Sequence, residues 1–507
     1  MKRIACIVMV IFVGMFFFTV HCTSAENPKY GGKLVVGQDI DAVGLDPYKS
    51  TAMASWNFYE QIYNTLLEFD NQGNLQPSLA VSWESSDPQT YVFHLRKGVK
   101  FHDGKDFGAE DVKATFDRMM DPKTASIRAK QFKLVDRVEI VDQYTVRFIL
   151  KSPYGPFLNF LAAKQYSAIQ SKYLIDKGVD FNTVVIGTGP FQLVKYTPND
   201  KMLLKKNPLY WEKGLPYLDE IEIRLIKDAA SRVAALRSKS VDYTWLIEPQ
   251  LVKILMKEKG IQSATTPATA NKRLYLNCTK APLDNVQVRR ALSMATDRKS
   301  ILQVAVLGKG ELSGPIPPAA GDFALSPEKL SYYTYDPEGA KKLLAKAGYP
   351  KGLKLTIKVS AIHVIDQYIV QMLQRQWEKS GVEVQILQEE WGTILRDWES
   401  LNYQIIHITD IWRPDPDEYV SYLNTKSRTG FQDPGIEKLV MDGLTTVDRE
   451  KRVTIYHEIE KKLTEDAPIL YIFARPQRFE FWHDYVKGYS PTPMTERTAF
   501  KNTWLSK

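Results

Sequence analysis

Cysteine is scarce in this sequence. The 507 residues include three cysteines, and two of them, Cys6 and Cys22, lie within the first 25 residues. Once those residues are removed only Cys278 remains, so no intrachain disulfide can form. The fold must therefore be stabilised by burial of apolar side chains. We interpret Cys278, which follows the apolar stretch 274–276, as a packing residue rather than a nucleophile.

A strong charge of either sign is also missing. The net charge is +8, with 44% hydrophobic and 25% charged residues. This charge is too dilute over so long a chain to require a polyanion, so we expect no nucleic-acid partner. The length exceeds what one hydrophobic core supports, roughly 250–300 residues, so we expect two or three domains.

Long apolar runs are absent except at the beginning of the chain. Lys2 and Arg3 precede an uncharged apolar run over 4–20, and small residues follow at 23–25. This pattern predicts that residues 1–25 are a signal peptide, cleaved after Ala25, and that the protein is exported to the periplasm. Two alternatives are an uncleaved membrane anchor and attachment through a lipid on Cys22.

Catalytic motifs are missing as well. The sequence has no His-Glu-x-x-His, Cys-x-x-Cys, Gly-x-Ser-x-Gly or phosphate-binding Gly-x-x-x-x-Gly-Lys pattern. Glu389-Glu390 and Asp415-Pro416-Asp417 could act as acid–base pairs, but adjacent acids are more often solvated or capping groups. We therefore predict a protein that is not an enzyme and that needs no cofactor or metal.

The first part of the chain has the pattern of β-strands. Residues 91–96 and 144–150 alternate apolar and polar side chains, as half-buried strands do. Between them we predict a helix over 109–120, which has Glu110 and Asp111 in its first turn and ends before Asp121-Pro122.

The later part alternates helix and strand. Asp336 can cap a helix that begins at Pro337 and ends near Gly348, and a strand over 353–359 follows. We then predict a helix ending at Gly381, a strand over 382–387, and, after a further helix over 448–465, a strand over 469–473. This order predicts a parallel or mixed sheet covered by helices.

Aromatic residues are plentiful, with 10 Trp and 26 Tyr. Trp56, Trp245, Trp391 and Trp412 each lie beside polar or turn residues. Any one of them could pack in a core or between domains. Together, in a chain without catalytic motifs, they favour an aromatic-lined cleft that stacks on a solute.

Several motifs along the chain resemble one family. Leu79-Ala-Val-Ser-Trp83, the stretch 91–104 (YVFHLRKGVKFHDG) and Ala109-Glu-Asp-Val112 are similar to the signature of the family 5 extracellular solute-binding proteins. These are the oligopeptide-, dipeptide- and nickel-binding components of ABC importers. The resemblance continues through residues 45–47, 187–191, 207–211, 288–292, 335–337 and 345–348.

The resemblance implies an α/β fold of the two-lobed periplasmic-binding-protein type (type II, the large three-domain form), with two hinge crossovers near residues 280 and 482. Domain I would comprise residues 26–66, 187–280 and 482–507, domain II residues 67–186, and domain III, the second lobe, residues 281–481.

The implied function is capture of a small solute, either a peptide or another organic compound. The two lobes would close around it and deliver it to the membrane permease of an ABC importer. We expect a monomer. The alternatives are a metal-chelate or haem receptor of the same family, a periplasmic hydrolase, and a holdase for unfolded chains.

The resemblance also implies positions for ligand contacts. The stretch 45–67 aligns with oligopeptide-binding proteins and places Thr51, Ala52 and Met53 on the cleft wall. Trp245 matches a strand-end aromatic that lies against the ligand, and Trp391 matches another cleft aromatic.

One further segment departs from the family pattern. Where peptide binders have an aspartate that pairs with the ligand's amino terminus, this chain has Trp412 or Arg413, or Asp415 in a different register. We expect these three residues and the nearby Asp410 to contact the ligand. An arginine there favours a carboxylate or phosphate, and a tryptophan favours stacking. Alternatively, Arg413 pairs with Asp410 or Asp417. The stretch 360–363 lacks the arginine with which dipeptide binders hold the ligand's carboxyl end.

Overall fold

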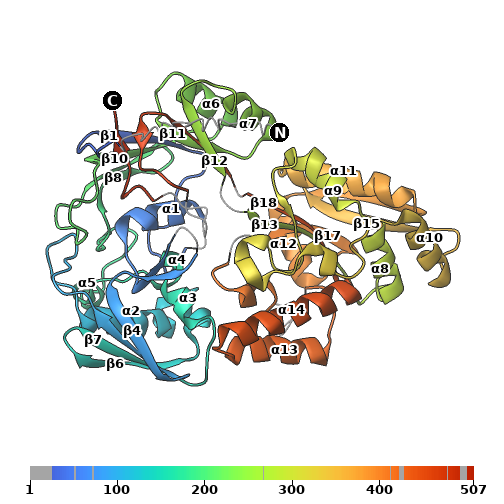
Figure 1. Cartoon of the computed structure of the whole chain (residues 1–507), viewed down its shortest axis with the longest axis horizontal. Coiled ribbons are helices and arrows are strands. Elements are labelled where there is room, and N and C mark those ends of the chain that lie inside the picture. Colours follow the sequence, from blue (N-terminus) through green and yellow to red (C-terminus); the bar gives the residue numbers. More distant parts are fainter. Residues whose placement is uncertain are drawn as a thin grey trace, which may run out of the picture.

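The computed structural model describes residues 26–50, 53–70, 73–265, 268–410, 413–421, 428–476, 478–491 and 499–507. They form two lobes, shown in Figure 1. The first lobe is blue to green and also contains the red C-terminal segment, whereas the second lobe is yellow-green to orange-red. The predicted signal peptide, Thr51 and Trp412 lie outside the described residues.

The upper part of the first lobe is built on a mixed sheet. Within the described ranges seven strands pair in the order β12-β19-β11-β1-β10-β9-β8. Strand β1 pairs in parallel with β10 and β11, and β19 pairs antiparallel with β11 and β12. The elements of this part are β1 (Lys33–Gln38), α1 (Met53–Ile62), β8 (Phe191–Thr197), β9 (Lys201–Lys206), β10 (Glu220–Leu225), α6 (Ala229–Arg237), β11 (Tyr243–Leu246), α7 (Pro249–Leu255), β12 (Ile261–Thr265), β19 (Phe479–His483), β20 (Val486–Lys487) and β21 (Trp504–Leu505).

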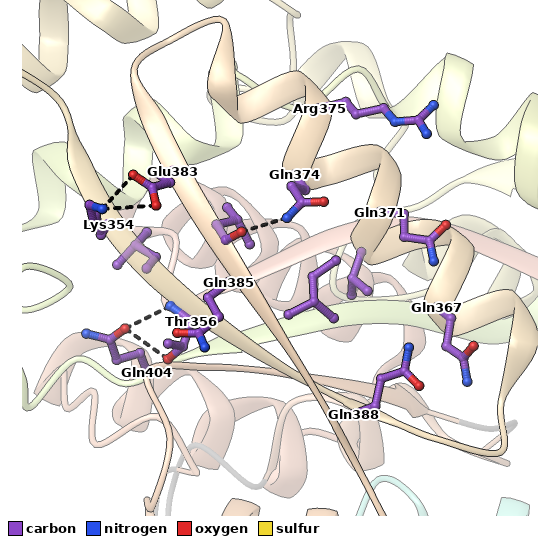
Figure 2. A pocket seen from close by; sticks show the side chains of 14 residues that line it. Lys354, Thr356, Gln367, Gln371, Gln374, Arg375, Glu383, Gln385, Gln388 and Gln404 are labelled. Carbon is purple, nitrogen blue, oxygen red and sulfur yellow. Dashed lines mark hydrogen bonds and ion pairs between the residues drawn. The ribbon is translucent and has the colours of Figure 1, made fainter.

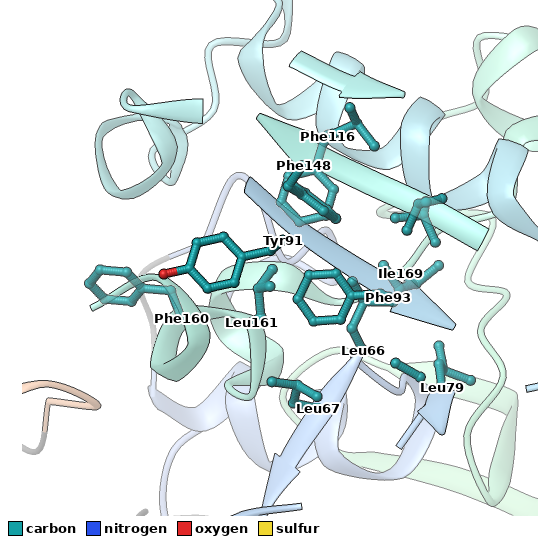
Figure 3. Close-up of a cluster of buried hydrophobic side chains, with 14 of the residues drawn as sticks. Leu66, Leu67, Leu79, Tyr91, Phe93, Phe116, Phe148, Phe160, Leu161 and Ile169 are labelled. Carbon is teal, nitrogen blue, oxygen red and sulfur yellow. The ribbon is translucent and has the colours of Figure 1, made fainter. Parts of the chain in front are cut away.

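The lower part of the first lobe has its own antiparallel sheet, in the order β4-β5-β7-β6. Alternate residues of β5 and β7 are buried, and Phe93 of β5 and Phe116 of α2 both pack edge to face against Phe148 of β7 (Figure 3). This domain comprises β2 (Leu67–Phe69), β3 (Leu75–Pro77), β4 (Ala80–Asp87), β5 (Thr90–Leu95), α2 (Ala109–Met120), β6 (Val135–Asp142), β7 (Thr145–Leu150), α3 (Phe157–Leu161), α4 (Lys164–Ser167) and α5 (Lys172–Asp176).

The second lobe contains a sheet in the order β14-β18-β13-β17-β15-β16. Strands β15 and β16 pair in parallel, and α11 packs against both of them. The elements are β13 (Ala268–Leu276), α8 (Val286–Met294), α9 (Arg298–Val306), β14 (Glu311–Leu312), α10 (Pro337–Lys346), β15 (Leu353–Ser360), α11 (Val364–Glu378), β16 (Val382–Glu389), α12 (Trp391–Ser400), β17 (Ile405–Asp410), α13 (Pro434–Thr445), α14 (Arg449–Asp466) and β18 (Ile469–Pro476).

The α/β fold and the strands and helices named from their patterns are confirmed. Helix α2 has the expected bounds, and the Asp336 carboxylate accepts a hydrogen bond from the amide of Gly339 at the beginning of α10. Trp56 differs from the expectation: it lies in α1 and is buried in the core of the first lobe rather than in a cleft.

The chain passes between the lobes at two places. Strand β12 ends at Thr265 in the sheet of the first lobe and β13 begins at Ala268 in that of the second, so the chain changes lobe between these residues, earlier than the expected crossover near 280. Strand β18 likewise ends at Pro476 in the second lobe and β19 begins at Phe479 in the first, so the chain changes lobe again between these residues rather than near 482. Strand β13 is buried along its whole length. Because residues 271–273 are polar, the sequence pattern did not predict a buried strand there.

The lobes also meet away from these passages. Asn159 of α3 donates a hydrogen bond to Asp415 of the second lobe, at 2.9 Å. Gln131 and Tyr166 of the first lobe both donate to the Glu418 carboxylate, at 3.1 and 3.0 Å.

Candidate functional site

A cavity of about 680 Å³ lies between the two lobes. Both lobes contribute polar and aromatic side chains to its wall. Those of the first lobe include Asp39, Asn57, Trp245, Glu248 and Arg478, and those of the second include Lys272, His363, Asp366, Trp391, Thr409 and Arg475.

Strand pairing explains how the second lobe brings polar groups together in this wall. Lys272 of β13 lies opposite Thr409 of β17, and Ala270, two residues earlier, lies opposite Arg475 of β18. Because side chains two residues apart share a face of a strand, Lys272, Thr409 and Arg475 extend from the same face of the sheet. They lie near the end of the sheet from which the chain crosses to the first lobe.

Lys272 and Asp366 form a buried ion pair in this wall. The Lys272 Nζ donates to Asp366 Oδ1 at 2.5 Å and to Thr409 Oγ1 at 2.7 Å. Burial lowers the pKa of Lys272 to about 8, although Asp366 opposes the shift. Burial would raise the pKa of Asp366, but Lys272 and His407 reverse this and hold it below its usual value. The pair thus places a cation and an anion side by side at the surface of the cavity.

The first lobe contributes an arginine stacked on an indole. Trp245 of β11 lies opposite Glu480 of β19, and Arg478 precedes Glu480 by two residues, so all three share one face. The Arg478 guanidinium carbon lies 4.6 Å from the centre of the Trp245 ring, and its Nε donates to Glu480 at 2.8 Å. This arrangement holds the guanidinium in a fixed orientation at the cavity.

A second indole lies on the opposite wall. Trp391 is the first residue of α12, where Glu390 caps the helix by accepting a hydrogen bond from the Thr393 amide at 3.2 Å. Its ring meets the His363 ring edge to face, with centres 5.0 Å apart. Burial lowers the pKa of His363, so a neutral imidazole accompanies the indole near neutral pH.

The structure brings together two of the site residues expected from the sequence, Trp245 and Trp391. Met53 begins helix α1, next to Ala54 of the cavity wall, but its side chain lies outside the described part of the structure. The ligand roles of Thr51 and Trp412 remain predictions, since these residues are not described.

The other expected residues lie in ion pairs within the protein. Asp410 pairs with both Arg273 and Arg413, the latter at 3.3 Å, which is one of the alternatives the sequence left open. Asp415 is buried and receives two hydrogen bonds from Arg452, at 3.0 and 2.6 Å. Their roles as ligand contacts also remain predictions.

Several charged residues of the cavity were not anticipated, above all Lys272, Asp366, Arg475 and Arg478. Lys272 could have been noticed, because Asn271, Lys272 and Arg273 directly precede the apolar stretch 274–276. Nothing near Arg475 or Arg478 in the sequence distinguishes them from surface arginines.

Another hollow lies on the second lobe alone, between α11 and strands β15 and β16 (Figure 2). Its labelled side chains are mostly amides, among them Gln371, Gln374, Gln385 and Gln388. Gln374 donates to the Val384 carbonyl at 2.7 Å, so it is already engaged with the outer strand of the sheet. Because only one lobe contributes to this hollow, closure of the lobes would not enclose a solute there.

In the part of the chain that the structure describes, no group of three or more His, Cys, Asp or Glu side chains is arranged to hold a metal ion. None of its helices combines the length and apolar character needed to cross a membrane.

Two lobes joined by two passages, with an aromatic and charged cavity between them, define a solute-binding protein that closes around its ligand. Comparison with known proteins leads to the same class of protein. The family model for bacterial extracellular solute-binding proteins, family 5, matches residues 74–431. The chain belongs to this family.

Individual relatives are similar over nearly the whole chain. The glutathione-binding protein GsiB of Pectobacterium atrosepticum is 30% identical over 470 residues, covering 89% of this chain and 91% of GsiB. Among solved structures, the periplasmic binding protein DppA of Helicobacter pylori, in complex with the peptide STSA, has a TM-score of 0.79 at 28% identity and covers 94% of this chain and 99% of DppA. The oligopeptide-binding protein AppA of Bacillus subtilis, in complex with a nonapeptide, has a TM-score of 0.79 at 25% identity and covers 95% of this chain and 100% of AppA.

These findings confirm the function expected from the sequence. The protein is a solute-binding receptor of an ABC importer, and it acts outside the cytoplasm. It is not an enzyme: it binds a solute between its lobes and delivers it to the membrane permease.

Proposed function

We propose that the solute is a short peptide or a peptide-like zwitterion of a few residues. The observation that supports this most directly is the charge pattern of the cavity between the lobes. Asp39 and Glu248 of the first lobe supply carboxylates, while Lys272, Arg475 and Arg478 supply cations. A solute with an ammonium group and a carboxylate can form charge-assisted hydrogen bonds with both sets, whereas a sugar or an apolar compound cannot.

The size and the aromatic walls of the cavity support the same class of solute. A volume of about 680 Å³ is in the usual range for small-molecule sites and is too small for an unfolded chain. Trp245 from the first lobe and Trp391 from the second would stack on side chains or peptide planes and exclude water. The relatives named for glutathione and for peptides have ligands of this chemistry.

We further propose that residues 1–25 direct export and are removed, and that the mature protein binds its solute as a monomer. The alternatives, a lipid on Cys22 or an uncleaved anchor, would keep the protein at the membrane surface. Intact-mass measurement of the protein recovered from both the periplasmic and the membrane fraction distinguishes the three, because cleavage, lipidation and retention of the segment give different masses.

The solute class is tested by native mass spectrometry of the freshly purified protein, followed by calorimetry. The probes are glutathione, di-alanine and tri-alanine, with the nickel–histidine chelate and haem as non-peptide comparators. We expect a one-to-one complex with at least one peptide and recovery of the peptide with unchanged mass. Binding of the chelate or of haem without binding of any peptide would overturn the proposal.

A further inference from the structure

Three cationic side chains converge where the lobes are joined. Lys272 and Arg475 extend from one face of the second lobe's sheet, and Arg478 lies just before β19 of the first lobe. Arg475 lies near the end of β18 in the second lobe and Arg478 directly precedes β19 in the first, so they stand on either side of the point where the chain changes lobe. All three line the cavity between the lobes.

Arg478 retains an unused donor in this position. Its side chain is 5% exposed, its Nε donates to Glu480, and its Nη1 lies 3.5 Å from the Asn57 side-chain oxygen. Its Nη2 finds no hydrogen-bond partner among the described residues. A buried guanidinium nitrogen without an acceptor is costly, and such a group in a binding cavity points to an acceptor brought by the ligand.

We propose that Arg478, Arg475 and Lys272 form a carboxylate-binding subsite beside the two passages between the lobes, and that this subsite selects solutes with a free carboxylate. The proposal rests on the function proposed above and specifies which end of the solute is recognised there. The subsite is separate from the stretch 360–363, where dipeptide binders have the arginine that holds the ligand's carboxyl end and this chain has none.

The geometry favours a carboxylate over other acceptors. Glu480 and the Trp245 ring fix the plane of the Arg478 guanidinium, so its free Nη2 edge presents a planar donor that suits a carboxylate oxygen. Lys272 is held in place by Asp366 and Thr409, so its ammonium group is a fixed donor whose charge Asp366 balances. Such a preorganised set binds an anion at little cost in side-chain entropy.

This position also links recognition to closure. A carboxylate that contacts Arg478 of the first lobe and Arg475 of the second is held by both lobes at once. Such a ligand binds the closed arrangement better than the open one and therefore shifts the equilibrium towards closure. A solute without the carboxylate would lose affinity and part of this shift.

The first test uses the unaltered protein and matched ligands. Calorimetry compares tri-alanine with its C-terminal amide, and glutathione with the amide of its glycine carboxylate. We expect each acid to bind about 10- to 100-fold more tightly than its amide, as for loss of a charge-assisted hydrogen bond. Acids and amides binding within twofold of each other would overturn the subsite while the proposed function stands. If neither form of either peptide binds, the proposed function fails and the subsite with it.

The second test changes the protein. Arg475→Gln and Arg478→Lys should reduce the acid-to-amide ratio to below about threefold, whereas Arg375→Gln, an exposed arginine of α11 in the other hollow, should leave it unchanged. Thermal melts establish that each variant is folded. If Arg478→Lys fails to fold, Arg475→Gln and the comparison of acids with amides still test the subsite. An unchanged ratio in Arg475→Gln overturns the proposed role of this residue and with it the three-residue subsite.

Discussion

The Lys272 ammonium and the Asp366 carboxylate face each other at 2.5 Å in the wall of the cavity between the lobes, and each residue is only 3% exposed. Lys272 comes from a strand in the centre of the second lobe's sheet, and Asp366 comes from the first turn of α11. The pair therefore anchors a helix to the sheet at the point where the solute is expected to bind. A buried pair of this kind is costly to break, because the remaining charge has no nearby water to solvate it.

Removing one partner should destabilise the protein more than removing both. We expect Lys272→Met to lower the free energy of unfolding by about 3–5 kcal/mol, since it leaves Asp366 buried and uncompensated. The double variant Lys272→Met/Asp366→Leu should recover most of this loss. Urea unfolding gives the free energy of unfolding of the unaltered protein, the single variant and the double variant. Equal stability of the two variants would contradict the pairing.

Trp391→Ala should weaken binding without unfolding the protein. The indole lies at the beginning of α12 and lines the cavity, so its loss removes apolar contact with the solute, and we expect affinity to fall about 10-fold or more. Trp398→Ala is the matched control: Trp398 is in the same helix but packs against Tyr275 and Arg428. Calorimetry with a bound peptide should show little change for Trp398→Ala. Unchanged affinity in Trp391→Ala would contradict the cavity assignment.

Much of the fold could be predicted because local chemistry is decisive where an element is amphipathic or capped. Asp336 before Pro337 marks the beginning of a helix in sequence and structure alike. The passages between the lobes could not be located this way. Strand β13 contains Asn271, Lys272 and Arg273 although it is buried, because its partners are supplied by residues such as Asp366 and Asp410, which are distant in sequence.

The site was predictable only in part, for the same reason. Trp245 and Trp391 stand out because large aromatics beside polar residues are unusual, and both line the cavity. Arg475 and Arg478 do not stand out, since their positions depend on how β18 and β19 pair with strands about 200 residues or more earlier in the chain. Only the tertiary structure shows that they face the same space.

Stability should depend on pH through Asp417. Burial, reinforced by the neighbouring Asp415, raises the pKa of Asp417 to about 8. Between about pH 4 and 8 the folded state therefore holds a proton that the unfolded state has released, and stability contributed by this group is lost as the pH rises. The slope reaches at most about 1.4 kcal/mol per pH unit for one proton.

Asp417→Asn isolates this contribution. The amide keeps the shape of the side chain but cannot ionise, so the variant should gain stability relative to the unaltered protein as the pH rises from 5 to 8. Urea midpoints of both proteins at each pH give the difference directly. A difference that stays constant over this range would show that Asp417 does not hold the proton.

The contact of Tyr166 with Glu418 should help to set the balance between open and closed lobes. The Tyr166 hydroxyl belongs to the first lobe and donates to a carboxylate of the second at 3.0 Å, so it can stabilise only arrangements in which the lobes approach. Tyr166→Phe removes a hydrogen bond to a charged group, worth about 1.5–3 kcal/mol, and leaves the ring in its core. The closed population should fall and with it the apparent affinity, by about 10-fold.

Small-angle scattering and calorimetry test this together. Tyr166→Phe should show a larger radius of gyration without solute and weaker binding, while saturating solute should restore the compact form, since the solute itself favours closure. Tyr91→Phe is the control, because Tyr91 lies in the same core and none of the hydrogen bonds described joins it to the second lobe. If Tyr166→Phe and Tyr91→Phe gave the same scattering and the same affinity, the contact would be a consequence of closure and not one of its causes.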